Sequence, residues 1–208
     1  MPTYLSHLLL KQLQQQTLNH LQLAISELQM IPHVRFAKKP AGNSWSANEC
    51  LQHLNSYGLY YLPAIENAIA AAGKQPASSP TFRTGWLGNY FTRLMTAGPD
   101  NKPVKKMQSP KEHQPKTIID SYEVISTFID QQEKLLQLLE AAKQQDLNAI
   151  RIPVSISKFI RLKMGDTFSF LVMHNNRHVL QAQRALGSNN ERGLHAANLL
   201  ERAMVNNY

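Results

Sequence analysis

Residues 118–140 read IIDSYEVISTFIDQQEKLLQLLE, and this stretch has the clearest periodicity in the chain. Apolar and amide side chains recur in it at alternating steps of four and three residues, at Ile118, Tyr122, Ile125, Ile129, Gln132, Leu136 and Leu139. Such steps place side chains along one face of an α-helix and are typical of the seam of an antiparallel helical bundle. We therefore predict a long helix here whose seam packs against other helices.

Two helices are predicted before this one. The first covers about residues 4–30, and its buried stripe contains Leu5, Leu8, Leu9, Leu21, Ile25 and Leu28. The second begins at Ser46, because Ser46 and Glu49 have the spacing of a capping box, in which the hydroxyl and the carboxylate each accept a backbone N–H. Gly73 is its predicted end, and Pro63 inside it can bend it.

A fourth helix is predicted near the end of the chain. It begins near Asp166 or Thr167, either of which can cap it, and ends at Gly187. Strand patterns are scarce, so the predicted fold is all-α, a four-helix bundle formed by residues 1–187. The polar residues 188–208 are predicted to be a C-terminal extension with a loose short helix.

Two long connections join these helices. Residues 74–115 form a crossover between the second and third helices that is far longer than a normal turn. Its aromatic part, residues 83–95, is predicted to form a short extra helix lying on the bundle, whereas residues 101–116 are rich in lysine. Residues 146–165 are predicted to be an extended segment that leans on the bundle, with a basic part at residues 151–163.

Composition limits the classes of protein that fit. The chain has one cysteine among 208 residues, so it cannot form an internal disulfide, which suits a reducing compartment. No run of apolar residues reaches the roughly 18 needed to cross a membrane, and we expect no cleaved leader. The formal net charge of +8 attracts anions of any kind. We expect a cytoplasmic protein without a membrane partner.

The eight histidines separate into two groups. Five lie among polar residues near the termini or in connections and are expected to be solvated or structural, namely His7, His20, His33, His113 and His195. By contrast, His174 and His178 are one helical turn apart on the face that also carries Leu171 and Ala182. Both rings are therefore expected to face the core, where they cost roughly several kcal/mol unless their nitrogens find partners.

Either a divalent metal or hydrogen bonds could satisfy this histidine pair. Neutral imidazole is a preferred ligand of zinc, nickel and related ions. The alternative partners are side chains of the third helix, such as Gln132. A third metal ligand must come from another helix, and His53 inside the second helix is the candidate. Three histidines would leave an open coordination position, as in catalytic metal sites. Cys50 nearby is predicted to be a small buried residue rather than a ligand.

Two segments resemble the signatures of a known family. Residues 45–54, WSANECLQHL, resemble the pattern W-S-x-x-E-x-L-x-H-L of DinB-like proteins. Residues 174–181, HNNRHVLQ, resemble that family's H-x-x-x-H pattern followed closely by Gln, and the two segments lie in the family's order, about 120 residues apart. The resemblance implies a DinB-like four-helix bundle that binds a divalent metal ion through His53, His174 and His178.

The resemblance also implies a class of reactions. The family includes metal-dependent transferases that join a low-molecular-weight thiol to an electrophile, thiol-dependent isomerases and proposed hydrolases. We therefore expect a thiol S-transferase or a hydrolase of a small molecule, in which the metal acts as a Lewis acid and a low-molecular-weight thiol can be a second cofactor. Glu49, one turn before His53, is the candidate to orient that ring or to move a proton, although a capping-box role alone also explains it. The candidates to hold an anionic thiol or substrate are Lys158, Arg161 and Arg177.

A binding module without catalysis is the alternative function. The basic connections and the nearby Trp86, Tyr90 and Phe91 could offer nucleic acid an electrostatic and stacking surface. Nucleic acid is disfavoured as a partner, because the charge is spread over connections rather than concentrated on one helix face. The region around Trp86 is also a candidate homodimer surface.

Overall fold

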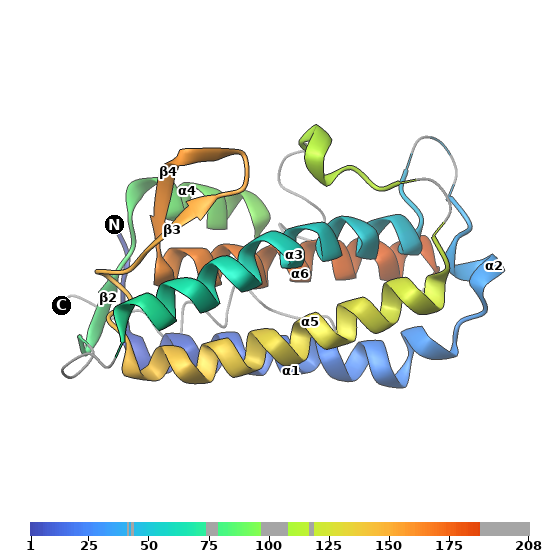
Figure 1. The fold of residues 1–208 in the computed structure, drawn as a ribbon. Helices are drawn as coiled ribbons and strands as arrows, with labels where there is room; N and C mark the ends of the chain where they lie inside the picture. Colours follow the sequence, from blue (N-terminus) through green and yellow to red (C-terminus); the bar gives the residue numbers. More distant parts are fainter. Residues whose placement is uncertain (41, 43, 74–78, 97–107, 117–118, 188–208) are drawn as a thin grey trace.

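The computed structural model describes residues 1–40, 42, 44–73, 79–96, 108–116 and 119–187. Within these residues the elements are β1 (Thr3–Leu5), α1 (Ser6–Ser26), the 3₁₀ turn η1 (Leu28–Met30), α2 (His33–Phe36), α3 (Ala47–Ala72), β2 (Thr81–Arg83), α4 (Trp86–Met95), η3 (Lys111–His113), α5 (Ser121–Ala141), η4 (Ala142–Gln144), β3 (Arg151–Val154), β4 (Ser157–Lys163) and α6 (Met164–Ala185). The protein is mainly helical, as predicted (Figure 1). None of the described helices is both long and apolar enough to cross a membrane.

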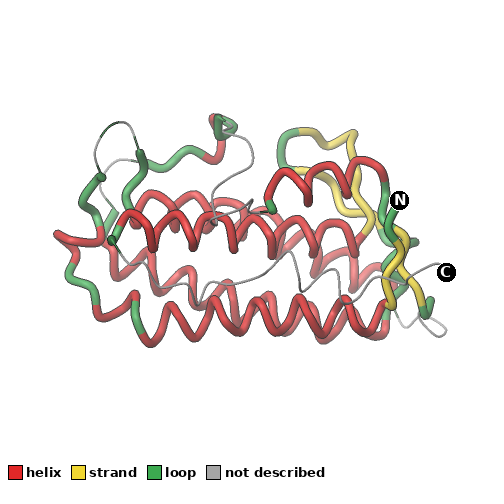
Figure 2. Tube along the Cα trace, turned by 180° about the vertical axis from the view of Figure 1, so that it is seen from behind, coloured by secondary structure: helices red, strands yellow, loops and turns green. Residues whose placement is uncertain are grey.

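Four long helices, α1, α3, α5 and α6, lie side by side and form a four-helix bundle (Figures 1 and 2). α5 packs against α1 and α3, and α6 packs against the same two helices. In Figure 1, α1 and α6 run in one direction and α3 and α5 in the other. α5 is therefore antiparallel to α1 but parallel to α3, which the predicted antiparallel seam does not anticipate. The long crossover returns the chain to the end at which α3 begins, where Asn48 Nδ2 donates to Ser121 Oγ at 2.8 Å.

Local sequence sets both ends of α3. The Ser46 hydroxyl accepts the Glu49 N–H at 3.2 Å and the Glu49 carboxylate accepts the Ser46 N–H at 2.9 Å, so the predicted capping box is confirmed. Gly73 follows the last turn with a φ of 63°, a left-handed conformation that glycine adopts without a steric penalty. Pro63 lies inside the helix, where it removes one backbone donor.

The buried face of α5 is wider than the predicted seam. Three seam residues are buried as predicted, namely Ile125, Gln132 and Leu139. Tyr122 is 58% exposed, whereas Val124 and Phe128, outside the seam, are buried, and Ile118 lies outside the described residues. The difference arises because α5 contacts α1 on one side and α3 on another, so its apolar stripe is wider than a single seam.

α1 is shorter than predicted, and its buried face is only partly the predicted stripe. It ends at Ser26, and a separate 3₁₀ turn follows. Leu9, Leu21 and Leu28 are buried as predicted, whereas Ile25 is 47% exposed and Leu10, Leu13 and Ala24 are buried in addition. Leucines occupy several faces of this helix, so the pattern alone does not decide its rotation.

α6 begins at Met164, before both of its predicted caps. Thr167 donates its hydroxyl back to the carbonyl of the preceding turn, and the Asp166 carboxylate accepts the Gly85 N–H at 2.9 Å. Asp166 therefore does not cap α6, and its hydrogen bond to Gly85 instead holds the start of α4 against the bundle. Gly88 permits this approach, because a Cβ there would lie 2.1 Å from Asp166 Cγ.

The two long connections contain regular structure. α4 lies within the predicted 83–95 segment and packs on α6, as predicted. The connection 146–165 is a β-hairpin rather than a single extended segment, and strands β3 and β4 pair Ile152 with Leu162. Residues 101–107 of the basic segment and the predicted C-terminal extension lie outside the described residues.

The apolar core consists of two clusters along the bundle. On α6, Met173 belongs to one cluster and Val179 to the other. The intervening turn carries His174 and His178, which therefore lie where the two clusters meet. Polar side chains at this level need polar partners of their own.

Candidate metal centre

Three histidines from two helices converge between the core clusters, and we call them the histidine triad. His53 lies on α3, and His174 and His178 lie one turn apart on α6. One ring nitrogen of each lies within 4.8 Å of the other two, and the ring centroids are 4.6–4.9 Å apart. The structure therefore brings together the three side chains that the sequence indicates.

Hydrogen bonds determine which nitrogen of two triad rings carries the proton. His53 Nδ1 lies 2.6 Å from the carbonyl oxygen of His113, and His178 Nδ1 lies 3.0 Å from Gln181 Oε1. Both oxygens can only accept, so each Nδ1 donates its proton. The Nε2 of each neutral ring then has a free lone pair, which is the form that binds a metal.

The third ring has a different environment. His174 Nε2 lies 3.1 Å from His53 Nε2, while His174 Nδ1 has no hydrogen-bond partner among the described residues. A neutral His174 can donate its Nε2 proton to the unprotonated His53 Nε2, and a cation bound between the two nitrogens would take the place of that proton. A tetrahedral zinc ion would separate its ligand nitrogens by about 3.3 Å. The spacing and the donor set therefore fit a divalent ion.

Burial keeps the three rings neutral. The exposed fractions of His53, His174 and His178 are 3%, 3% and 8%. Desolvation lowers the pKa of His53 to about 4 and lowers the pKa values of His174 and His178 well below the usual 6.5, and nearby rings and the charge of Arg177 add to the effect. Neutral rings need not release a proton before they bind a metal, so ligation near neutral pH is unopposed by protonation.

Aromatic side chains surround the triad. The Trp45 ring centroid lies 5.0 Å from that of His53, the Tyr57 centroid lies 4.3 Å from that of His174, and Phe170 stacks on His174 at 5.5 Å. None of these rings was predicted to be a site residue. Helical spacing could have found two of them, because Tyr57 follows His53 by four residues. Phe170 likewise precedes His174 by four residues.

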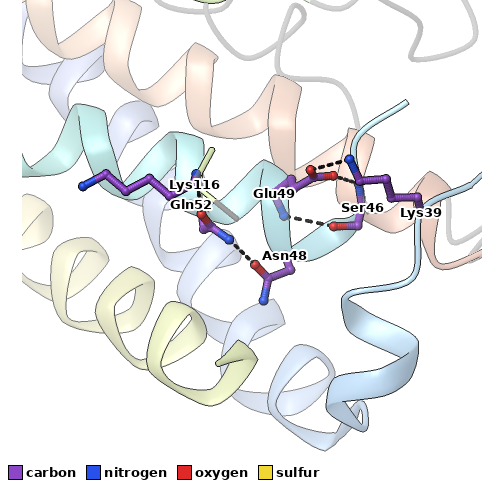
Figure 3. Close-up of polar contacts among 6 residues, drawn as sticks. All are labelled: Lys39, Ser46, Asn48, Glu49, Gln52 and Lys116. Carbon is purple, nitrogen blue, oxygen red and sulfur yellow. Dashed lines mark hydrogen bonds and ion pairs between the residues drawn. The ribbon is translucent and has the colours of Figure 1, made fainter. Parts of the chain in front are cut away.

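Glu49 lies at the start of α3, where Figure 3 shows its carboxylate between Ser46 and Lys39. One oxygen accepts the Ser46 N–H, and the other lies 2.7 Å from Lys39 Nζ. His53 Nδ1, the atom that an orienting carboxylate would contact, donates to the His113 carbonyl instead. The capping role of Glu49 is confirmed, and its role in proton transfer stays a prediction.

Two histidines that were expected to be solvated or structural are buried. His20 is 3% exposed, and its Nε2 lies 3.4 Å from Asn176 Oδ1. His113 is 5% exposed and belongs to the crossover segment that contacts α3. Both are therefore structural rather than solvated, and the sequence could not decide between these two expectations because no local pattern reports that a helix face or a connection will be covered by distant chain. Of the other three histidines in this group, His7 and His33 are exposed, and His195 lies outside the described residues.

Two further predictions concern neighbours of the triad. Gln132 Oε1 accepts from Asn175 Nδ2 at 3.2 Å, and no described hydrogen bond joins Gln132 to the triad. The alternative in which Gln132 satisfies the histidines is therefore wrong. Cys50 is fully buried, and burial followed by the charge of the neighbouring carboxylate raises its pKa, as befits a residue that is not a ligand.

The cations predicted to hold an anion lie in different places. Arg177 is on the same turn of α6 as the triad histidines, and its guanidinium donates to the Leu94 carbonyl oxygen at 2.8 Å. It thereby holds the end of α4 against α6. Lys158 and Arg161 are exposed on β4.

The chain was compared with known protein families, curated proteins and solved structures. A family model described as the DinB superfamily matches residues 9–182. The matched span includes the whole triad and most of each of the four bundle helices. No curated protein and no solved structure matches the chain.

Proposed function

The chain belongs to the DinB superfamily, and from this premise we propose that it is a divalent-metal-dependent enzyme that acts on a small molecule as a thiol S-transferase or a hydrolase. One observation carries the proposal. Three neutral, buried imidazoles from two helices present ring nitrogens within 4.8 Å of one another. Imidazoles in this arrangement are suited to zinc or nickel.

The triad would hold the metal through His53, His174 and His178, which leaves coordination positions for a substrate. When bound, the ion would supply Lewis acidity that lowers the pKa of a thiol or of water near neutral pH. The carbonyl of His113 and the amide of Gln181 would keep two of the three rings in the orientation that ligation needs.

The surrounding side chains suit a reaction shielded from bulk water. Tyr57 and Phe170 are each 7% exposed, and together with Trp45 they form apolar walls around the triad. A low dielectric strengthens the attraction between a cation and an anionic nucleophile such as a thiolate. Trp45 is only half-buried, so we propose that a small molecule approaches on its side.

Metal content tests the proposal most directly. Protein purified without a histidine tag is expected to contain about one equivalent of a divalent metal by elemental analysis. The variant in which all three triad histidines are replaced by alanine is expected to contain almost none. His7→Ala is the matched control, because this histidine is exposed on α1. Equal metal content in the wild type and the triple variant would exclude a three-histidine centre.

A second measurement separates the two reaction classes. A thiol S-transferase forms a bond between the thiol sulfur and the electrophilic carbon as the S–H proton is lost and the bond from that carbon to its leaving group breaks, so mass spectrometry of a thiol–electrophile mixture is expected to show the thioether product and the released group. A hydrolase would add the elements of water to an ester or amide without any thiol. In both cases the activity is expected to disappear with chelator and return with added metal. Activity that persists in the triple variant would contradict the proposed mechanism.

A binding role without catalysis is favoured by one region, the β3–β4 hairpin. Phe159 is fully exposed and Ile156 is 57% exposed, and the cations Lys158 and Arg161 lie beside them on β4. An exposed aromatic ring among cations can stack on a nucleic-acid base. This role predicts binding to random oligonucleotides that weakens steeply between 50 and 200 mM salt, about a thousandfold for six phosphate contacts. Salt-independent binding, or none, would exclude it.

The homodimer proposal concerns α4. Trp86 is 70% exposed and Tyr90 is 51% exposed on this helix. Light scattering of the wild type and of Trp86→Ser is expected to show a dimer and a monomer, respectively. A monomeric wild type would remove this proposal without bearing on the metal centre.

A further inference from the structure

The proton donor of His53 faces a segment far away in sequence. Its Nδ1 lies 2.6 Å from the carbonyl oxygen of His113 and 3.3 Å from Ser109 Oγ. Residues 109–116, which we call the covering segment, include both acceptors. Figure 1 shows this segment, in yellow-green, on the outer side of α3, which η3 contacts. The tautomer of His53 therefore depends on where the covering segment lies.

The side chain of His113 holds the covering segment in place. Its ring stacks on Tyr57 with a centroid separation of 3.9 Å and an interplanar angle of 30°. Its Nδ1 lies 2.9 Å from Ser56 Oγ, and that hydroxyl donates to the His53 carbonyl at 2.7 Å. Because the hydroxyl proton is used on the carbonyl, His113 Nδ1 is the donor to Ser56.

The contacts are reciprocal and confined to one turn of α3. His113 gives its carbonyl to the His53 ring, while Ser56 and Tyr57, three and four residues after His53, bind the His113 ring. The Lys116 N–H also donates to Gln52 Oε1 at 3.0 Å, on the residue before His53. A connection that only crosses the bundle would not need a buried ring held by two contacts on α3.

We infer that His113 is a positioning residue: its ring anchors the covering segment so that its own carbonyl fixes His53 in the Nδ1–H tautomer, with Nε2 turned to the other triad histidines. The inference rests on the proposed function for its consequence, since this tautomer makes Nε2 the metal ligand. Loss of such a supporting hydrogen bond typically weakens metal binding by about tenfold to a hundredfold. His113 itself supplies no ligand.

Three substitutions separate the two anchors of the His113 ring. His113→Ala removes both the stacking contact and the hydrogen bond, His113→Phe keeps the stacking, and His113→Asn keeps a polar group toward Ser56. Lys111→Ala is the matched control, because Lys111 is an exposed residue of the same 3₁₀ turn. Each variant is first checked for a wild-type thermal transition, and His113→Phe carries the test if His113→Ala does not fold.

The first readout needs no metal. The ¹⁵N shifts of the His53 ring, assigned with His53→Gln, report which nitrogen carries the proton in the metal-free protein. We expect the Nδ1–H tautomer in the wild type and in Lys111→Ala, a large Nε2–H population in His113→Ala, and intermediate populations in His113→Phe and His113→Asn.

The second readout is the zinc dissociation constant, measured by competition with a chromophoric chelator. It is expected to rise tenfold to a hundredfold in His113→Ala, less in His113→Phe, and less than twofold in Lys111→Ala. An unchanged His53 tautomer in folded His113→Ala overturns the inference, and so does an unchanged zinc affinity. A wild type that takes up neither zinc nor nickel would overturn the proposed function, while a tautomer shift in His113→Ala would still support the positioning of His53 by His113.

Discussion

Two buried regions that contain histidine lie at the same level of the bundle, on different faces of α6. One is the histidine triad. The other is the His20 cluster, formed by Gln16, His20 and Asn176. Asn176 lies between His174 and His178 in sequence, so one helical turn contributes to both regions. Their histidines are equally buried, and burial lowers the pKa of both His20 and His53 to about 4.

The partners of the histidines make the difference. In the His20 cluster, Gln16 Nε2 donates to Asn176 Oδ1 at 2.8 Å and lies 3.2 Å from His20 Nε2. Amides both donate and accept, so Gln16 and Asn176 can bond to each other and to His20 Nε2, while His20 Nδ1 and Gln16 Oε1 have no partner among the described residues. In the triad the neighbours are other imidazoles, and two Nε2 atoms face each other. A buried histidine with a lowered pKa therefore does not by itself indicate a metal site, whereas three imidazoles whose ring nitrogens converge offer a set of ligands that could hold a metal ion.

The largest expected effect is on zinc affinity, which a substitution in the histidine triad should lower and a substitution in the His20 cluster should not. His178→Ala removes one of three ligands, so zinc affinity is expected to fall by more than about a hundredfold, beyond the range of a supporting hydrogen bond. His20→Ala is expected to bind zinc as the wild type does. Competition with a chelator measures both. Equal losses of zinc affinity in the two variants would contradict the conclusion that the triad, and not the His20 cluster, binds the metal.

The next effect is a pH dependence that His20 contributes without any metal. An unfolded histidine titrates near 6.5 and the folded His20 near 4, so only the unfolded chain binds this proton between those values. The free energy of unfolding is therefore greatest above pH 6.5 and falls as the pH drops toward 4.

Urea unfolding of the metal-free protein checks this contribution. His20→Gln is expected to make the decline shallower by about 1.4 kcal/mol per pH unit in that interval, or about 3 kcal/mol over two units. Curves of equal slope for the wild type and His20→Gln would show that His20 takes up a proton in the folded state.

A smaller effect tests whether the His20 cluster is purely structural. His20→Leu leaves the buried amides of Gln16 and Asn176 with one partner fewer, which is expected to cost about 1–3 kcal/mol of unfolding free energy at pH 7.5. Zinc affinity is expected to stay within twofold of the wild type. A large loss of zinc affinity with little loss of stability would instead assign the cluster to the metal centre.

The smallest expected effect concerns Glu49, which lies on α3 one turn before His53. Glu49→Ala removes the capping box and is expected to cost about 1 kcal/mol of stability. It is expected to leave zinc affinity unchanged, because its carboxylate contacts Ser46 and Lys39. Glu49→Gln is the matched control, since Gln can also complete a capping box. A tenfold loss of activity in stable Glu49→Gln would support the predicted proton transfer.

Much of the fold and of the triad follows from local pattern. The capping box at Ser46, the end of α3 at Gly73 and the short helix in the crossover all depend on residues within a turn or two of one another. The pairing of His174 with His178 follows from helical spacing alone. The buried faces of α1 and α5 were predicted only in part, because several faces of these helices carry apolar residues and the neighbours decide which faces are covered.

Sequence alone thus indicated the four helices and the three imidazoles, because helix periodicity and capping are short-range properties of the chain. Only the tertiary structure decided that His113 orients His53, across 60 residues, and that Gln16 donates to Asn176 across 160 residues. Contacts at such separations depend on the path of the whole chain. A local pattern can therefore name the candidate metal ligands, but it cannot identify the groups that hold them in place.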